Sequence, residues 1–276
     1  MATWFITGCS TGIGRATAAA AAAAGHTVVA TARRPETLED LVASSDGKVI
    51  ALALDVTDPD AVRTAAEVAE RLTGGVDVVV NNAGIGYFAT IEESDPAQAR
   101  AVIDANFWGV AHVTHAFLPH LRERRSGHII TVSSIAGVRG SAGMGYYCAS
   151  KWAASGFMES LAKEVAHLGI KVSIIEPGPV LSQWIPSGAK VHDGHPDYAE
   201  VMDPYWERID ALPGNQPGDP DALAQAMVAL TTLETPPLHL LAGRHAITQG
   251  RAKAAALASE IDAWEELGAS IDTRNR

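Results

Sequence analysis

Seven short and almost uniformly apolar runs alternate along this chain with stretches long enough to form helices. Because so few positions in the runs are polar, both faces of the expected sheet must be covered, as in a parallel sheet. This alternation predicts an α/β fold with a doubly wound parallel sheet of about seven strands. Strands are expected at Thr3–Thr7, Thr27–Ala32, Lys48–Leu54, Val76–Val80, His128–Ser133, Ile170–Ile175 and Leu238–Leu241.

The helical stretches and one irregular segment complete the expected layout. With 276 residues the chain fits one α/β domain, and we predict a single domain over 1–276. From Pro177 to Pro220 there is no clear period, but turn-forming residues and four aromatic residues are present. We interpret about 179–220 as a substrate lid, with disorder as the alternative. Helices are expected near 13–24, 59–73, 97–124, 147–168, 220–232 and 251–267.

Composition excludes several classes of protein. The chain has 21 Lys and Arg against 32 Asp and Glu, a formal net charge of −11, and no basic stripe, which disfavours nucleic-acid binding. Two cysteines, Cys9 and Cys148, cannot form a disulfide framework and fit a reducing compartment. No run approaches a membrane span, and the first residues do not look like a signal peptide, so a cytoplasmic protein without membrane contact is expected.

A glycine-rich segment follows the first expected strand, with the sequence Thr7-Gly8-Cys9-Ser10-Thr11-Gly12-Ile13-Gly14. Glycines let a pyrophosphate approach the backbone, and the free N–H groups and dipole of the next helix favour an anion. Its place between a strand and a helix favours dinucleotide binding over a simple turn. The loop alone does not separate a nicotinamide enzyme from a methyltransferase.

The end of the second expected strand indicates which nicotinamide cofactor is used. Enzymes that recognise the 2′-hydroxyl of NAD usually carry an acidic residue about 20 positions beyond the glycines. Here Arg33 and Arg34 follow Ala32. A guanidinium group pairs bidentately with a 2′-phosphate, so NADP(H) is favoured. The alternative is two solvated loop arginines.

Tyr147 and Lys151 lie four positions apart at the start of a helical stretch, so both side chains project from one face. A lysine ammonium and a cationic nicotinamide ring would lower the pKa of the phenol toward neutrality and make it a usable acid and base. Ser134 follows the strand that ends at Ser133, where ligands of parallel sheets bind, and its hydroxyl would hydrogen-bond a substrate carbonyl. An ordinary helix pair and a turn-forming serine are the alternatives, and Ser133 competes for the second role.

These motifs together resemble the short-chain dehydrogenase/reductase family, whose sheet is a Rossmann fold. The resemblance covers nearly the whole chain. The ending from Leu240 through Arg251 to Leu267 resembles the 17β-hydroxysteroid-dehydrogenase-like branch of the family. The family motifs occur in order as the glycine loop, Asn81-Asn82-Ala83-Gly84, Asn106, Ser134, Tyr147-x-x-x-Lys151 and Pro177-Gly178.

The resemblance implies a role for each matching residue. Tyr147 exchanges the proton, Ser134 positions the substrate oxygen, and Lys151 binds the nicotinamide ribose. Asn106 holds a water that links Lys151 to solvent. The cofactor-binding set implied for NADP(H) is Gly8, Ser10, Thr11, Gly12, Ile13, Gly14, Arg33, Arg34, Asp55, Val56, Asn82, Ala83, Gly84, Tyr147, Lys151, Pro177, Gly178, Val180 and Ser182. Ser182 stands where threonine is usual and keeps the hydroxyl.

The predicted function is therefore NADPH-dependent hydride transfer between the nicotinamide and a ketone or secondary alcohol. Aromatic residues of the lid and Tyr87-Phe88 suggest an apolar or ring-bearing small-molecule substrate. A catalytically silent NADP sensor and a sugar-nucleotide epimerase or dehydratase are the alternatives. His192 and His195 lack a partner acid at ligand spacing, so no metal site is predicted. Family members commonly form homodimers or homotetramers through the helices matching 97–124 and 147–168.

Overall fold

A seven-stranded parallel sheet forms the centre of the computed structural model, which describes residues 1–191 and 194–272. The strand order β3-β2-β1-β4-β6-β7-β9 reverses direction between β1 and β4, as in a doubly wound sheet. All seven expected strands are confirmed, with shifts of a few residues at their ends. They are β1 (Thr3–Ile6), β2 (Thr27–Ala32), β3 (Val49–Ala53), β4 (Val78–Asn81), β6 (Gly127–Val132), β7 (Ile170–Pro177) and β9 (His239–Ala242).

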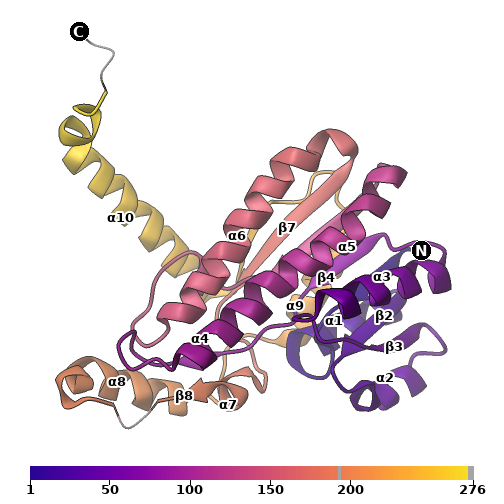
Figure 1. The fold of residues 1–276 in the computed structure, drawn as a ribbon, viewed down its shortest axis with the longest axis horizontal. Coiled ribbons are helices and arrows are strands. Elements are labelled where there is room, and N and C mark those ends of the chain that lie inside the picture. The colour runs from indigo at the N-terminus through magenta and orange to yellow at the C-terminus, as the bar shows by residue number, and fades with distance from the viewer. Residues whose placement is uncertain (192–193, 273–276) are drawn as a thin grey trace.

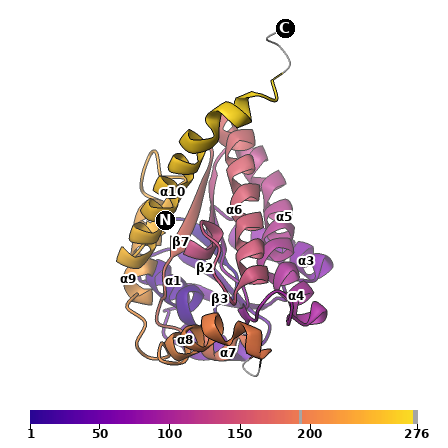
Figure 2. The same ribbon diagram turned by 90° about the vertical axis from the view of Figure 1, so that its left-hand side faces the viewer.

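Helices cover both faces of this sheet (Figures 1 and 2). Helices α3 (Pro59–Thr73), α5 (Gly109–Arg124) and α6 (Gly145–Val165) pack on the face that carries Phe5. Helices α1 (Gly12–Ala23) and α9 (Pro220–Leu230) pack on the face that carries Trp4. Successive residues of a strand point to opposite faces, so each apolar strand supplies both cores. The strand sequences are almost continuously apolar because both of their faces are buried.

The stretch expected as one helix over 97–124 is divided into three parts. It comprises α4 (Pro96–Ile103), a π-helical turn η2 (Asp104–Trp108) and α5. Single π-helical turns within helices are frequent at functional sites. The remaining segments of this half of the chain are short: η1 (Pro35–Leu38), α2 (Glu39–Ala43), η3 (Ile135–Gly137) and η4 (Ala166–Leu168).

The segment interpreted as a lid is folded in its described part. It contains α7 (Trp184–Ser187), β8 (Ala189–Lys190), η5 (Pro196–Tyr198) and α8 (Ala199–Asp210). Strand β8 pairs in parallel with β5 (Tyr87–Phe88), and α7 and α8 lie across one end of the sheet (Figures 1 and 2). No helical period was expected in this segment from the sequence, and for α8 that interpretation is wrong. Its buried side chains follow helical spacing, at Met202, Tyr205, Trp206 and Ile209.

The last helix, α10 (Arg244–Ala269), starts earlier than expected and leaves the body of the protein (Figures 1 and 2). Only Ala246 and Gly250 of this helix are buried. None of the described helices, α10 included, combines the length and the apolar character needed to cross a bilayer.

Candidate active site

Three glycines allow the tight course of the loop between β1 and α1. Gly8 and Gly12 have positive φ angles of 72° and 58°, which favour glycine. A Cβ on Gly14 would lie 2.4 Å from the carbonyl oxygen of Gly8 and 2.3 Å from Nδ2 of Asn82. The loop therefore has no room for side chains at these positions, and its backbone stays open to a ligand.

Asn82 and Thr7 hold this loop against the end of β4. Asn82 donates from Nδ2 to the carbonyl oxygens of Thr7 (2.8 Å) and Gly8 (3.1 Å). The Thr7 hydroxyl accepts hydrogen bonds from the backbone N–H groups of Asn82 (2.9 Å) and Ala83 (3.0 Å). Asn82, expected to line the cofactor, thus also shapes the loop. Thr7 was missed as a positioning residue, although its hydroxyl at a strand end is the kind of signal that marks one.

The N-terminus of α1 is suited to a phosphate group. The N-cap residue Thr11 makes no side-chain capping hydrogen bond, and no acidic residue lies in the first turn. The first N–H groups of a helix need partners, and its dipole favours an anion there. With the glycine cradle, this uncapped end at Gly12 and Ile13 fits the pyrophosphate of a dinucleotide.

Arg33 and Arg34 are exposed where β2 ends, and Arg33 lies near the carboxylate of Asp55. Burial raises the pKa of Asp55, but hydrogen bonds from Thr57 and the charge of Arg33 outweigh this and leave the pKa below its usual value. Asp55 accepts from the Thr57 N–H at 3.0 Å and the Thr57 hydroxyl at 2.8 Å. The structure thus brings the predicted residues Arg33 and Asp55 together.

Val56 is placed differently from its neighbour Asp55. Its side chain is buried in the core, where a Cβ on Gly109 would lie 2.7 Å from its Cγ2. Its carbonyl oxygen lies 3.1 Å from Nδ1 of His112. The side chain of Val56 is thus committed to the packing of α5 and leaves only backbone atoms for a ligand.

Tyr147 and Lys151 lie together at the start of α6, and both are 6% exposed. The Lys151 Nζ atom is 5.8 Å from the centroid of the Tyr147 ring and donates a 2.9 Å hydrogen bond to the carbonyl oxygen of Val132. Burial lowers the pKa of Lys151 to about 8. The neighbouring Tyr146, five positions before Lys151, is 36% exposed.

Of the two serines at the end of β6, Ser134 is the one that contacts Tyr147. Ser134 forms a hydrogen bond with Tyr147 and also caps η3 by accepting from the Ala136 N–H at 3.1 Å. The hydroxyl of Ser133 is buried and contacts Ser155 Oγ at 2.9 Å. Of these two serines, therefore, only Ser134 contacts the phenol of Tyr147.

The pKa of Tyr147 is raised by the protein's own groups, whereas the lowering expected from the sequence also depends on a cationic nicotinamide ring. Burial is the main cause, and it outweighs the lowering effect of the Ser134 hydrogen bond. The ammonium group of Lys151 donates a hydrogen bond to the carbonyl oxygen of Val132 and lies 5.8 Å from the centroid of the Tyr147 ring. The protein's own groups thus favour the neutral phenol, the form that donates a proton.

Asn106 occupies the π-helical turn η2 and is fully buried. Its Oδ1 accepts from the Ile85 N–H at 2.8 Å, and its Nδ2 lies 3.0 Å from both Ile85 O and Ser150 Oγ. Ser150 in turn donates to the carbonyl oxygen of Tyr147 at 2.7 Å. The π turn thereby joins α6 to the segment after β4. Ser150 was missed, and its position on α6 between the two catalytic candidates gave no distinct signal.

Gly84 lies between the predicted relay residues. A Cβ there would be 2.9 Å from Oδ1 of Asn106 and 3.6 Å from Nζ of Lys151. The structure therefore brings Gly84, Asn106 and Lys151 together, as the motif predicts. No room remains for a side chain at Gly84.

The segment after β7 reaches back to the glycine loop. Gly178 donates to the Ala242 carbonyl at 3.1 Å, and Val180 forms an isolated bridge with Gly218. A Cβ on Gly12 would lie 3.1 Å from the Cβ of Ser182. The predicted nicotinamide-contacting residues from Pro177 to Ser182 thus run from the sheet end to the loop. The Ser182 hydroxyl donates to Val180 O at 3.2 Å.

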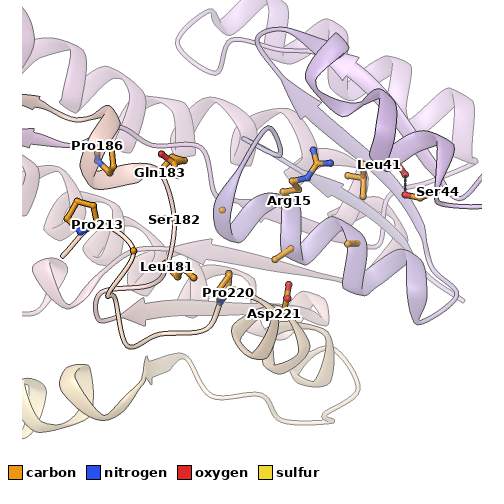
Figure 3. Close-up of a pocket in the computed structure, with 14 residues that line it drawn as sticks. Arg15, Leu41, Ser44, Leu181, Ser182, Gln183, Pro186, Pro213, Pro220 and Asp221 are labelled. Atoms are coloured by element: carbon orange, nitrogen blue, oxygen red, sulfur yellow. Dashed lines mark hydrogen bonds between the residues drawn. The ribbon is translucent and has the colours of Figure 1, made fainter. Parts of the chain in front are cut away.

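A cavity of about 650 Å³ is lined in part by Gly12 and Ser182 themselves (Figure 3). It is lined by one face of α1 with Arg15, by α2 and by the lid near Leu181 and Pro213. Arg15 forms an ion pair with Asp40. Ser134, Tyr147 and Lys151 do not line this cavity, so it is separate from the catalytic group.

Metal ligation has no candidate among the residues that the structure describes. None of their His, Cys, Asp and Glu side chains gather into a group of three that could hold an ion. His195 is exposed and its Nδ1 caps η5, and His192 lies outside the described residues.

This arrangement of glycine loop, serine, tyrosine and lysine on a doubly wound sheet defines a nicotinamide-dependent oxidoreductase. The family model for short chain dehydrogenases matches residues 2–187, and the chain belongs to that family. Oxidoreductase BOA17 of Botryotinia fuckeliana (strain B05.10) is 39% identical over 266 residues, which cover 96% of this chain and 97% of that protein.

Solved structures agree with this assignment. A short-chain dehydrogenase from Streptomyces avermitilis is 37% identical, with a TM-score of 0.91 over 99% of this chain and 100% of that chain. A metagenomic short-chain oxidoreductase in complex with NADP is 28% identical, with a TM-score of 0.69 over 87% and 96% of the two chains. The Rossmann-like fold of the chain is thereby confirmed.

Proposed function

We propose that the protein reduces a ketone with NADPH, or oxidises the corresponding secondary alcohol with NADP. One observation carries the proposal: the Tyr147 phenol is hydrogen-bonded to Ser134 beside the buried ammonium of Lys151. These groups lie at the carboxyl ends of the parallel strands, where ligands bind in such sheets. A bound nicotinamide would supply or accept the hydride.

The chain's own residues handle the proton and the developing charge. Ser134 donates a hydrogen bond to the substrate oxygen, which becomes negative as hydride arrives at the carbon. Tyr147 donates its phenolic proton to that oxygen in reduction and takes it back in alcohol oxidation. Lys151 hydrogen-bonds the ribose and returns a proton to Tyr147, and Asn106 holds the water that links Lys151 to solvent.

The preference for NADP(H) rests on the two arginines after β2. Both are exposed, no acidic residue stands in their place, and Arg33 already pairs electrostatically with Asp55. Gly8, Ser10, Thr11, Gly12, Ile13 and Gly14 would hold the pyrophosphate, and Ala83, Gly84, Pro177, Gly178, Val180 and Ser182 the nicotinamide half. Asp55 would meet the adenine amino group.

Exchanging one arginine tests this preference. Arg33→Asp places a carboxylate where the 2′-phosphate would lie, so the ratio of NADPH to NADH affinity should fall at least tenfold, a change of about 1.4 kcal/mol. The matched control is Arg71→Asp on the exposed side of α3, which should leave the ratio unchanged. An unchanged ratio in Arg33→Asp contradicts the assignment.

An apolar or ring-bearing substrate is the class that the lid favours. The Trp184 ring covers Tyr147, and behind it lies an apolar cluster of Phe88, Tyr205 and Trp206. Such a wall favours binding of apolar surface over charged groups. We propose the 17β-hydroxysteroid-dehydrogenase-like branch on the same grounds and on the segment from Leu240 to Leu267 that forms β9 and α10.

Turnover decides between this proposal and its alternatives. Absorbance of NADPH is followed with a panel of aryl, alicyclic and steroid ketones. Consumption of NADPH with formation of the alcohol supports the reductase. Tight NADPH binding without consumption across the panel supports a silent sensor, although the complete set of Ser134, Tyr147 and Lys151 disfavours it. Activity only on sugar nucleotides would support an epimerase or dehydratase.

A further inference from the structure

Beyond Lys253, helix α10 carries an apolar stripe that no other part of the described chain covers. Leu257, Ile261 and Trp264 are 47%, 59% and 66% exposed, and the whole helix beyond Lys253 is exposed. Large exposed apolar stripes of this kind mark interaction surfaces. The stripe follows alternating steps of three and four residues, which is the heptad spacing of paired helices. The same spacing starts at Ile247 and the buried Gly250, continues through Ala254, Leu257, Ile261, Trp264 and Gly268, and ends at Ile271, just past the end of α10.

The charges on the same helix are segregated along its length. Its first half carries Arg244, Arg251 and Lys253 without an acidic residue, and its second half carries four acidic residues without a basic one. The acidic residues are Glu260, Asp262, Glu265 and Glu266. Two copies of this helix packed in parallel would bring like charges together, whereas antiparallel packing sets each basic half against an acidic half.

We propose that α10 pairs with α10 of a second copy of this chain, in an antiparallel arrangement related by a twofold axis. In that register Ile261 meets Leu257 of the partner subunit, and Ala254 meets Trp264 of the partner subunit. Arg251 lies beside Glu265 of the partner subunit, and the axis repeats each contact. A twofold interface of this kind is self-complementary and closes after two copies.

A cavity at the base of α10 provides the space that the partner's tryptophan needs. Its volume is about 600 Å³, and it is lined by the small residues Gly250 and Ala254 together with Trp152 and Leu241. Glu176, which also lines the cavity, is 1% exposed, and its carboxylate contacts Nδ1 of His239 at 3.3 Å. When the two helices run antiparallel, Trp264 of the partner subunit therefore faces the cavity beside Gly250 and Ala254.

A lipid surface fits this helix less well than a second copy. Helices that lie in a membrane interface carry Lys and Arg beside their apolar face, and anionic headgroups attract those residues. Here Glu260, Glu265 and Glu266 accompany the most exposed apolar residues, so anionic lipid would repel this half. Glu260 also lies near the twofold axis, where it approaches its own copy, so Glu260→Gln should tighten the pairing.

Complementary charge reversals test the antiparallel arrangement in the full-length protein. Arg251→Glu alone sets two carboxylates against each other across the interface, and Glu265→Arg alone sets two guanidinium groups together. Each variant should therefore have half the molar mass of the wild type by light scattering. An equimolar mixture of the two should recover the wild-type mass, because in the mixed pair opposite charges face each other at both ends of the interface, as they do in the wild type. Only antiparallel pairing of these positions gives this pattern.

Controls separate the pairing from folding and from other interfaces. Glu266→Arg makes the same charge change on the opposite side of the helix and should keep the wild-type mass. NADPH binding should be equal in all variants, which shows that the domain is folded. Wild-type mass in both single variants, or no recovery in the mixture, overturns the proposal. The proposal is also overturned if the wild-type protein co-floats with vesicles of phosphatidylcholine and phosphatidylserine and has the molar mass of a monomer in solution.

Discussion

The indole ring of Trp184 lies over the phenol ring of Tyr147, with their centroids 4.7 Å apart and their planes at 51°. The indole also fits against Gly86, where a Cβ would lie 2.9 Å from Cζ2 of Trp184. Phe88 supports it from behind at 5.3 Å between ring centroids. The first helix of the lid therefore builds the wall beside the proposed proton donor.

Removing the Trp184 side chain should weaken substrate binding and leave cofactor binding unchanged. In Trp184→Ala the apolar surface next to Tyr147 is lost, so the KM for an aryl ketone should rise about tenfold, or about 1.4 kcal/mol. The Kd for NADPH, measured by fluorescence titration, should stay within about twofold of the wild-type value. Trp152→Ala, at an exposed tryptophan on the outside of α6, is the control and should change neither. An equal rise of both constants would show that Trp184 supports the cofactor instead.

Removing one oxygen atom tests the proton donor. Tyr147→Phe keeps the ring that packs against Trp184 but has no proton to give, so kcat should fall at least about 100-fold. NADPH affinity should be nearly unchanged, because the ring and Lys151 remain. The neighbouring, exposed Tyr146 gives the matched control, and Tyr146→Phe should have wild-type kcat. Activity above about a hundredth of the wild type in Tyr147→Phe would disprove the assignment.

The sequence predicts the sheet and the proximity of the main site residues because these depend on local patterns. Apolar runs mark the buried strands, and residues just beyond strand ends, such as Ser134 and Gly8, meet at one edge of a parallel sheet. Helical spacing places Tyr147 and Lys151 on one face and turns Tyr146 away. The choice between Ser133 and Ser134 needed the structure, since both stand at the same strand end.

Contacts between segments that are distant in the sequence could not be predicted, because no local pattern reports them. The hydrogen bonds that Asn82 makes to Thr7 and Gly8 join two strand ends about 75 positions apart. The pKa of Tyr147 depends on how deeply the lid and α6 bury the phenol, and no local pattern reports that burial. Helix α8 lies in a segment rich in turn-forming residues, where no helical period was expected, and it contains Pro204. Tertiary packing against Phe88 overrides that local signal.

A buried histidine should make stability fall in mild acid. His128 on β6 is 4% exposed and lies 3.0 Å from the Ser173 hydroxyl; burial, helped by the charge of Lys171, lowers its pKa to about 4. The unfolded chain takes up this proton near pH 6.5 and the folded chain only near pH 4. Stability from this group is therefore present above about pH 6.5 and is lost as pH falls through that window. Between about pH 7 and pH 5 the loss is about 2 kcal/mol.

Urea unfolding at both pH values measures this effect. His128→Gln should be less stable at about pH 7, because packing is disturbed, but its free energy of unfolding should fall by about 2 kcal/mol less than that of the wild type between about pH 7 and pH 5. His167→Gln, at an exposed histidine in η4, should show the wild-type difference. The same pH dependence in wild type and His128→Gln would remove His128 as the cause.

The same substitution at two glycines should have opposite effects. A Cβ at the buried Gly14 would overlap Gly8 O and Asn82 Nδ2, so Gly14→Ala must push the loop away from β4. Forced overpacking of this kind costs about 1–3 kcal/mol. Gly156, on the exposed side of α6, has nothing within 4 Å of its Cβ position, so Gly156→Ala should stabilise the protein by about 0.5–1 kcal/mol. Urea unfolding measures both changes, and NADPH titration should show weaker binding only in Gly14→Ala, because Gly14 lies in the glycine loop and Gly156 does not.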